Sequence, residues 1–154
     1  MLNKTECEGR GCIWDPNPKF IEIPKCYLNT SKIGYKLVGN PVNTENGFKV
    51  ELKLKETAKN LLKSMPQIDS LVFEVIYLTQ NILRFKILDP KTSRYEVPVQ
   101  KTFPLLTQRL PKIDEKSIKY FIELNSNETD FSFAVLRKDS KTRMFVKIYF
   151  KFDL

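Results

Sequence analysis

Hydrophobic and polar residues alternate along most of the chain after residue 33. In FKVELKL (48–54) apolar side chains take every second position, with Lys49 and Lys53 between them. MFVKIYFKF (144–152) repeats the pattern near the end of the chain. Such alternation is typical of strands that bury one face and expose the other to water.

About eight such segments follow one another at intervals of roughly ten residues, which predicts a mostly β chain folded as an antiparallel β-sandwich. Between them, GNPVNTENG (39–47) is rich in turn residues, and ETAKNLLKSM (56–65) predicts a short helix that Pro66 ends. Residues 101–117 are predicted to be loop. The predicted strands are GYKLV (34–38), FKVELKL (48–54), SLVFEVIYLT (70–79), ILRFKIL (82–88), RYEVPV (94–99), KYFIEL (119–124), FSFAVLRK (131–138) and MFVKIYFKF (144–152).

The first 28 residues are different in kind, because they are rich in Cys, Gly and Pro and show no periodicity. They predict a loop-dominated module held by a disulfide. We therefore expect two parts, a small cysteine module over 1–30 and a sheet domain over 31–154. The cysteines are Cys7, Cys12 and Cys26, and an odd number leaves at least one unpaired. Their spacing and the absence of histidine argue against a zinc site, so no metal is expected.

Three glycosylation sequons point to the secretory pathway. They begin at Asn3, Asn29 and Asn127, which are candidate N-glycosylation sites. The first fifteen residues lack the apolar core of a signal peptide, and no apolar run approaches the ~20 residues that span a bilayer. We therefore expect a secretory or extracellular protein whose signal or anchor is not encoded in this chain.

The net charge of +8 raises the question of a nucleic-acid partner. Hydrophobic content of 42% and charged content of 29% are ordinary for a globular domain. Lysines at alternate strand positions form a solvated face, which also discourages pairing between sheet edges. The sequence has no nucleic-acid reading motif, so we expect no nucleic-acid partner and keep a basic nucleic-acid-binding domain as a third alternative.

Catalytic residues are hard to find. Without histidine, the usual serine and cysteine triads are excluded, and five glycines form no phosphate-binding loop, so no cofactor is expected. Carboxylate pairs would suffice for glycoside hydrolysis. However, the candidates by residue type are better explained by turns, loops and outward strand positions. These candidates are Asp69, Glu74, Asp89, Glu96 and Glu123. We expect no catalytic residue in this chain.

The cysteine module contains CEGRGCIWDP (7–16) and IPKCY (23–27), and it resembles the second half of a trefoil (P-type) domain. Two positions depart from the family, since Ile13 replaces a cysteine and Lys25 replaces a tryptophan. The first half of the domain is missing. The resemblance implies a disulfide between Cys7 and Cys26 and leaves Cys12 unpaired. The matching positions are Cys7, Arg10, Gly11, Cys12, Trp14, Pro24, Cys26 and Tyr27.

The remaining chain resembles the N-terminal β-sandwich of glycoside hydrolase family 31, α-glucosidases of the sucrase-isomaltase and maltase-glucoamylase type. The resemblance rests on the strands of 71–99, which end in Asp-Pro and Arg-Tyr-Glu-Val-Pro, and on FSFAVLRKDSKTRMF (131–145). It implies a galactose-mutarotase-like sandwich that packs in cis against a catalytic (β/α)8 barrel, at an extracellular or apical membrane surface. The family's catalytic residues lie on the barrel, and none maps onto this chain. The chain is expected to end before the barrel, leaving an unpaired sheet edge at 144–152.

Two functions from different classes follow. The first is a non-catalytic support region of an α-glucosidase. The alternative is an independent carbohydrate-binding module that binds α-glucosides through a sandwich face or by stacking sugar rings on Trp14 and Tyr27. We expect Trp14 to be structural, because buried aromatic side chains usually serve packing.

Overall fold

The structure is a computed structural model that describes residues 3–19, 23–63, 65–93, 95, 112–125 and 130–149. It divides into two compact units. The N-terminal unit contains residues 1–34 and 54–67, and the sandwich unit contains residues 35–53 and 68–150. The first division falls at residue 34, and the boundary at residue 30 stays a prediction. The sequence did not indicate that 54–67 would join the N-terminal unit.

The N-terminal unit, which we predicted to be dominated by loops, begins with a short helix, α1 (Lys4–Gly9), that the sequence did not indicate. A capping box supplies the first turn of α1: the Glu6 amide donates to Asn3 Oδ1 at 2.8 Å, and the Asn3 amide donates to Glu6 Oε2 at 3.1 Å. Gly11, with φ of 79°, lies just past the helix, where a left-handed glycine commonly ends one. Two short strands follow, β1 (Ile13–Trp14) and β2 (Cys26–Tyr27), which pair antiparallel.

A second cluster in the N-terminal unit joins the 3-10 helix η1 (Thr30–Lys32) to helix α2 (Glu56–Leu61). Thr57 Oγ1 donates to the Lys32 carbonyl at 2.7 Å, and Lys55 Nζ donates to the Ser31 carbonyl at 3.1 Å. Gln67 Nε2 donates to carbonyls at the end of α2. These bonds explain why 54–67 belongs with the first 34 residues, and α2 confirms the short helix predicted within 56–65.

The sandwich unit contains a four-stranded antiparallel sheet of order β3-β4-β5-β6. Its strands are β3 (Tyr35–Thr44), β4 (Gly47–Leu54), β5 (Ser70–Thr79) and β6 (Ile82–Leu88). The prediction that 39–47 is a turn was wrong, because β3 continues to Thr44 and the turn occupies only Glu45 and Asn46. Pro41 is tolerated there because β3 is an outer strand of this sheet in the described part of the chain.

A second sheet has the order β7-β8-β9, with β7 (Tyr120–Asn125), β8 (Ser132–Arg137) and β9 (Arg143–Tyr149). Within the described ranges β9 pairs with β8 alone, so it is an outer strand of the described part of this sheet. The strand predicted at 94–99 and most of the loop predicted at 101–117 lie outside the described residues.

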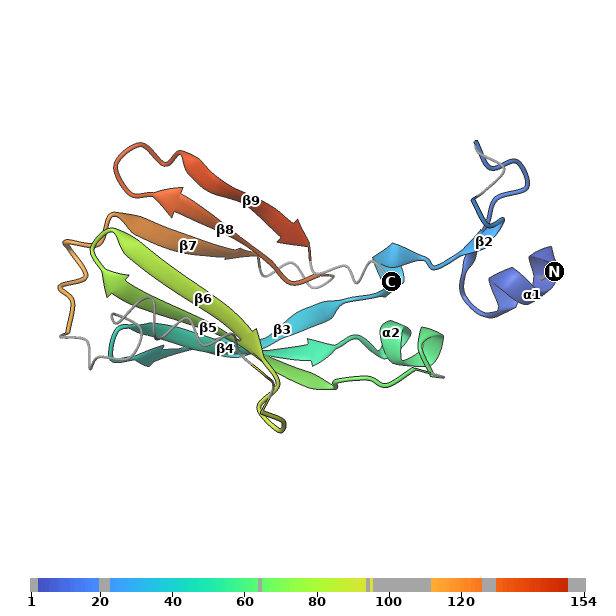
Figure 1. Ribbon diagram of the computed structural model, residues 1–154, viewed down its shortest axis with the longest axis horizontal. Coiled ribbons are helices and arrows are strands. Elements are labelled where there is room, and N and C mark those ends of the chain that lie inside the picture. Colours follow the sequence, from blue (N-terminus) through green and yellow to red (C-terminus); the bar gives the residue numbers. More distant parts are fainter. Residues whose placement is uncertain are drawn as a thin grey trace. The chain divides into compact units, whose positions relative to one another are not determined.

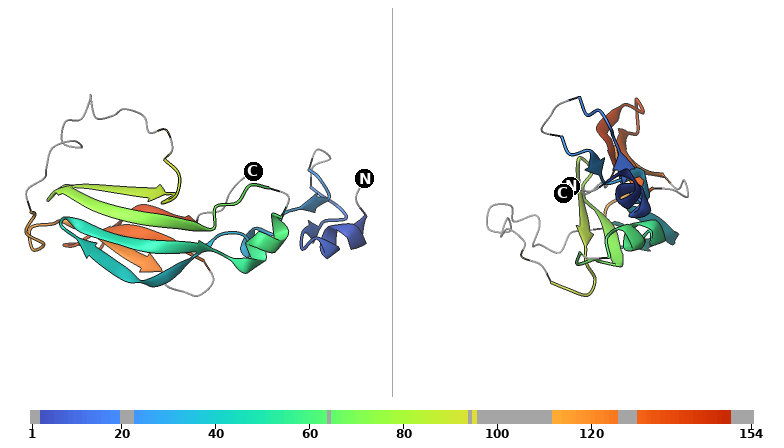
Figure 2. Two further views of the ribbon diagram at one scale, coloured as in Figure 1. Left: turned by 90° about the horizontal axis from the view of Figure 1, so that it is seen from below. Right: turned by 90° about the vertical axis from the view of Figure 1, so that its right-hand side faces the viewer.

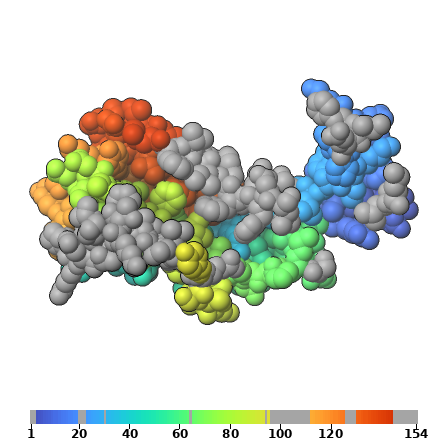
Figure 3. Space-filling model, in the orientation of Figure 1, coloured from blue at the N-terminus to red at the C-terminus, as the bar shows by residue number. Residues whose placement is uncertain are grey.

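The two sheets pack face to face through aromatic rings. The ring of Phe73 on β5 lies 5.2 Å from that of Phe131 and 4.6 Å from that of Phe133, and Phe85 on β6 lies 4.9 Å from Phe133. Seen from below, the four-stranded sheet lies in front of the orange and red strands of the other sheet (Figure 2). Figure 1 shows the same two layers edge-on, and in the space-filling view their atoms adjoin (Figure 3). The predicted antiparallel β-sandwich is confirmed.

Candidate binding site at the turn end of the sandwich

The structure places the cysteines and aromatic residues that the sequence singled out in the N-terminal unit. Cys7 and Cys26 form the disulfide that the trefoil resemblance implies, with Cα atoms 5.8 Å apart, and Cys12 is free and half-buried. Trp14 pairs with Cys26, and Tyr27 pairs with Ile13. Because neighbouring residues on a strand point to opposite faces, Trp14 and Tyr27 lie on opposite faces of this two-stranded ribbon. The register therefore does not bring them together as one sugar-stacking platform.

Three of the candidate carboxylates make structural contacts. Glu74 forms an ion pair of 2.9 Å with Lys49 on the neighbouring strand, and Glu123 approaches Arg143 at 3.8 Å. Asp89 accepts the Lys91 amide at 2.9 Å in a turn after β6. Asp69 precedes β5, and Glu96 lies outside the described residues. Among the described residues no group of three or more Cys, Asp or Glu is placed to hold a metal ion.

The described part of the chain contains no helix that is long and apolar enough to cross a membrane.

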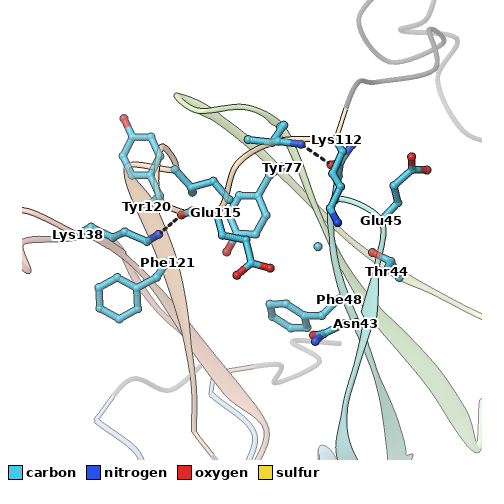
Figure 4. Close-up of a pocket in the computed structure, with 14 residues that line it drawn as sticks. Asn43, Thr44, Glu45, Phe48, Tyr77, Lys112, Glu115, Tyr120, Phe121 and Lys138 are labelled. Carbon is cyan, nitrogen blue, oxygen red and sulfur yellow. Dashed lines mark hydrogen bonds between the residues drawn. The ribbon is translucent and has the colours of Figure 1, made fainter.

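One end of the sandwich contains a hollow of about 210 Å³, which we call the turn-end hollow. It lies where the turn between β3 and β4 approaches the loop that precedes β7 (Figure 4). Phe48 and Tyr77 contribute from the core face of the four-stranded sheet, at the end of the buried layer. The lining residues are Asn43, Thr44, Glu45, Asn46, Gly47, Phe48, Tyr77, Lys112, Ile113, Glu115, Ile118, Tyr120, Phe121 and Lys138.

Hydrogen bonds fix the segments that form this hollow. Asn46 is the central link, because its Oδ1 accepts the Ile113 amide at 3.0 Å and its carbonyl accepts the Tyr77 amide at 2.7 Å. On the opposite side, Lys138 Nζ donates to the Glu115 carbonyl at 2.7 Å. Three segments distant in the sequence therefore hold one set of side chains in place before any ligand arrives.

The electrostatics of the turn-end hollow centre on Tyr77. Burial raises the pKa of its phenol above the ordinary 10.0, and the nearby Glu115 carboxylate raises that pKa further. Figure 4 shows the Tyr77 hydroxyl and the Glu115 carboxylate pointing into the same space, with the ring of Phe48 beside them. The phenol is therefore protonated at neutral pH and able to donate a hydrogen bond.

Sequence reasoning did not find this hollow. Glu115 falls in the segment predicted to be loop, and Tyr77 looks like one more position of an alternating strand. The one available signal is the Asn46-Gly47 pair between two strands, which is typical of a tight hairpin turn. It predicts the turn but not what the turn touches, since the contact with Ile113 bridges 67 positions of the chain.

The class of protein follows from the fold and from sequence comparison together. Residues 1–29 match the trefoil (P-type) domain, which here precedes an antiparallel β-sandwich. The chain is homologous over most of its length to members of glycoside hydrolase family 31.

Three relatives illustrate the homology. The chain is 37% identical to intestinal sucrase-isomaltase of Suncus murinus over 102 residues, which is 66% of this chain and 6% of the relative. It is 32% identical to intestinal sucrase-isomaltase of Oryctolagus cuniculus over 127 residues, covering 82% of this chain and 7% of the relative. It is 30% identical to lysosomal alpha-glucosidase of Mus musculus over 142 residues, covering 89% of this chain and 13% of the relative. The chain thus spans a small part of each relative's length.

Proposed function

We propose that this chain is a non-catalytic support region of an α-glucosidase, which packs in cis against the catalytic barrel and braces it. The observation that carries the proposal is the pattern of coverage. The match to rabbit sucrase-isomaltase takes in 82% of this chain and only 7% of that protein, so the homologous region is one small section of a much larger enzyme. In this proposal the activity belongs to the remainder of such an enzyme.

The contacts of the candidate carboxylates favour a non-catalytic role. Glu74 and Glu123, two of the carboxylates that are catalytic candidates by residue type, form ion pairs with Lys49 and Arg143. A general acid needs a raised pKa, and a retaining pair needs two carboxyl groups about 5–5.5 Å apart facing one bond. The structural contacts of Glu74 and Glu123 are instead those of strand residues on a sheet surface.

Strand β8 is buried on both faces within this chain. Ser132 and Ala134 alternate with Phe133, so they lie on the face of β8 opposite the aromatic core, yet they are 0% and 4% exposed. The Ser132 hydroxyl is buried without a hydrogen-bond partner in the described part of the chain. A buried unsatisfied hydroxyl costs about 1–3 kcal/mol, and because Ser132 and Ala134 are already covered within the chain, they offer no surface to a barrel.

The proposal is tested by incubating the purified 154-residue chain with a chromogenic α-glucoside. We expect release of the chromophore at the rate of a buffer blank, with an intact family 31 α-glucosidase as the positive control. Turnover above the blank that is abolished by heat denaturation would overturn the non-catalytic role.

A second test asks whether the partner is encoded beside this region. Sequencing the transcript that contains this reading frame should reveal family 31 barrel motifs downstream. A transcript without a barrel would contradict bracing in cis.

A further inference from the structure

We propose that the turn-end hollow binds a neutral sugar of about one hexose ring. This site is distinct from Trp14 and Tyr27, and its argument does not depend on the support role. It rests on the size of the hollow, the balance of its charges and the kinds of groups that point into it. Each is a property of residues held in place by the sandwich.

Size limits the ligand to a small molecule. The volume is about 210 Å³, and pockets for drug-sized ligands occupy roughly 300–1,000 Å³. One sugar ring therefore suits the hollow better than an oligosaccharide, and a longer chain would have to extend out of it.

Among the described residues that line the hollow, positive and negative side chains are equal in number. Two lysines, Lys112 and Lys138, line it together with two glutamates, Glu45 and Glu115. Lys138 Nζ also donates a hydrogen bond to the Glu115 carbonyl. An anionic ligand would meet the Glu115 carboxylate, and a cationic ligand would meet the Lys112 ammonium. The lining therefore favours a ligand without net charge.

The polar groups match a ring that carries many hydroxyls. The Glu115 carboxylate only accepts hydrogen bonds, and the protonated Tyr77 phenol donates as well as accepts. The Asn43 amide and the Thr44 hydroxyl add both kinds of group on the side of the β3–β4 turn (Figure 4). A sugar hydroxyl also donates and accepts, so one ring can satisfy such a mixed set.

An apolar surface completes the site. Phe48 lines the same hollow and packs against the aromatic core, with its ring 6.4 Å from that of Phe73. A pyranose has an apolar face of C–H groups as well as its hydroxyls, and aromatic side chains in binding pockets provide rigid contact area. Phe48 is therefore the residue against which we expect the ring to pack.

The experiment is an NMR titration of the 154-residue chain with D-glucose and with maltose, in which nitrogen–proton correlation spectra are recorded at each sugar concentration. We expect a Kd on the order of 1 mM, with saturable shifts for the amides that surround the hollow. The amides that report are Asn46, Gly47, Tyr77, Ile113 and Glu115. D-Glucuronate and D-glucosamine should bind more weakly than D-glucose.

Two variants remove polar groups while keeping the shape of the hollow. Glu115→Gln and Tyr77→Phe should each weaken D-glucose binding about tenfold. Glu51→Gln is the matched control, because Glu51 lies on the exposed face of β4 away from the hollow, and it should bind like the parent chain. Unchanged amide shifts along β5 would show that each variant keeps its fold.

Several outcomes would overturn the proposal. They are an absence of saturable shifts with both sugars, shifts confined to residues 13–27, tighter binding of the charged sugars, and an equal loss of affinity in Glu51→Gln and Glu115→Gln. Each of them leaves the turnover test of the support role unaffected.

Discussion

The rings of Phe73 and Phe133 meet across the two sheets with their centroids 4.6 Å apart. Phe73 is 0% exposed and Phe133 is 1% exposed, so this contact lies at the centre of the sandwich. One ring comes from β5 and the other from β8, strands whose segments are far apart in the sequence. The pair therefore joins the two sheets directly, and the remaining rings of the cluster surround it.

Removing either ring should destabilise the sandwich unit strongly. Phe73→Ala and Phe133→Ala should each lower the free energy of unfolding by about 3–5 kcal/mol, because each leaves a cavity in a closely packed layer. Because the two residues touch, the double variant should deviate from additivity by at least about 0.5 kcal/mol. Urea unfolding monitored by circular dichroism measures the free energy of unfolding of the two single variants and the double variant.

Tyr95→Ala is the control for the loss of an aromatic ring, since Tyr95 is 85% exposed. It should change the free energy of unfolding by no more than about 0.5 kcal/mol. If Phe73→Ala lowered the free energy of unfolding as little as Tyr95→Ala does, the central role of the contact between Phe73 and Phe133 would be contradicted.

The cysteines of the N-terminal unit should behave differently from one another. Cys26→Ser opens the loop closed by the disulfide with Cys7, across a sequence separation of 19. A closed loop of that length stabilises by roughly 3 kcal/mol through the unfolded chain. We expect amides of α1 and β2 to lose protection in hydrogen exchange while those of β5 keep theirs. Cys12→Ser is the control and should leave α1 protected, because Cys12 is free.

Some strands were predictable residue by residue and others were not. The predicted bounds of 70–79 and 82–88 equal those of β5 and β6. Strand β5 lies inside the sheet with alternating burial, and in β6 apolar residues alternate with Arg84 and Lys86. The second half of β3 was missed because it contains Gly39 and Pro41 and is exposed along its length. An outer strand with little buried surface carries no hydrophobic periodicity to detect.

Helix α1 and the site were beyond pattern reasoning for different physical reasons. Helix α1 spans six residues, too few for a helical repeat, and its one local signal is Asn3 followed by Glu6. The turn-end hollow depends on tertiary contacts, such as that of Asn46 with Ile113, and no local rule indicates them. The sandwich class was predictable because it depends on alternation and turn spacing alone.

Asn3 combines two roles that variants can separate, since it caps α1 and begins a sequon. In a secretory expression system we expect glycans at Asn3 and Asn29, detected as mass lost on endoglycosidase treatment. Thr5→Ala and Asn3→Asp should each lose the Asn3 glycan but keep α1, because the first retains the cap and an aspartate can still accept the Glu6 amide. Asn3→Ala should lose the glycan and also about 1 kcal/mol of helix stability.

Hydrogen exchange of the α1 amides distinguishes these cases. Equal protection of the α1 amides in Asn3→Ala and Asn3→Asp would contradict the capping role. If Thr5→Ala lost as much mass on endoglycosidase treatment as the parent chain, glycosylation at Asn3 would be contradicted.

Tyr77 should make the sandwich unit sensitive to alkaline pH. Burial first, and the Glu115 carboxylate second, raise the folded-state pKa of the phenol above 10.0. The unfolded phenol therefore ionises first as pH rises, so the stability that Tyr77 contributes is complete below about pH 10 and is lost as pH rises through the folded-state pKa. Tyr77→Phe should show a smaller fall in the free energy of unfolding between about pH 8 and about pH 11.

Urea titrations at several pH values measure this difference. Glu115→Gln should reduce the alkaline fall less than Tyr77→Phe does, because burial is the larger cause. Tyr95→Phe is the exposed control and should keep the parent profile. If Tyr77→Phe kept the parent's pH dependence of the free energy of unfolding, the alkaline fall would not be due to Tyr77.

Gly47 holds the β3–β4 turn directly on β5, and this close approach requires the absence of a side chain. A Cβ atom at Gly47 would overlap the carbonyl oxygen of Val75, which belongs to the strand backbone and has little freedom to move. Gly47→Ala should therefore lower the free energy of unfolding by about 1–3 kcal/mol, as overpacking does. It should also shift the amides around the turn-end hollow, because Asn46 and Phe48 flank it.

Gly9→Ala is the matched control. Gly9 lies in the last turn of α1, and a Cβ there meets nothing within 4 Å. Alanine favours a helix over glycine by about 1 kcal/mol, so this variant should be neutral or slightly stabilising. Urea unfolding of both variants, with NMR spectra of the hollow, gives the comparison. If Gly47→Ala matched Gly9→Ala in stability, the turn would have room to lift away from Val75, and the turn-end hollow would not be preformed.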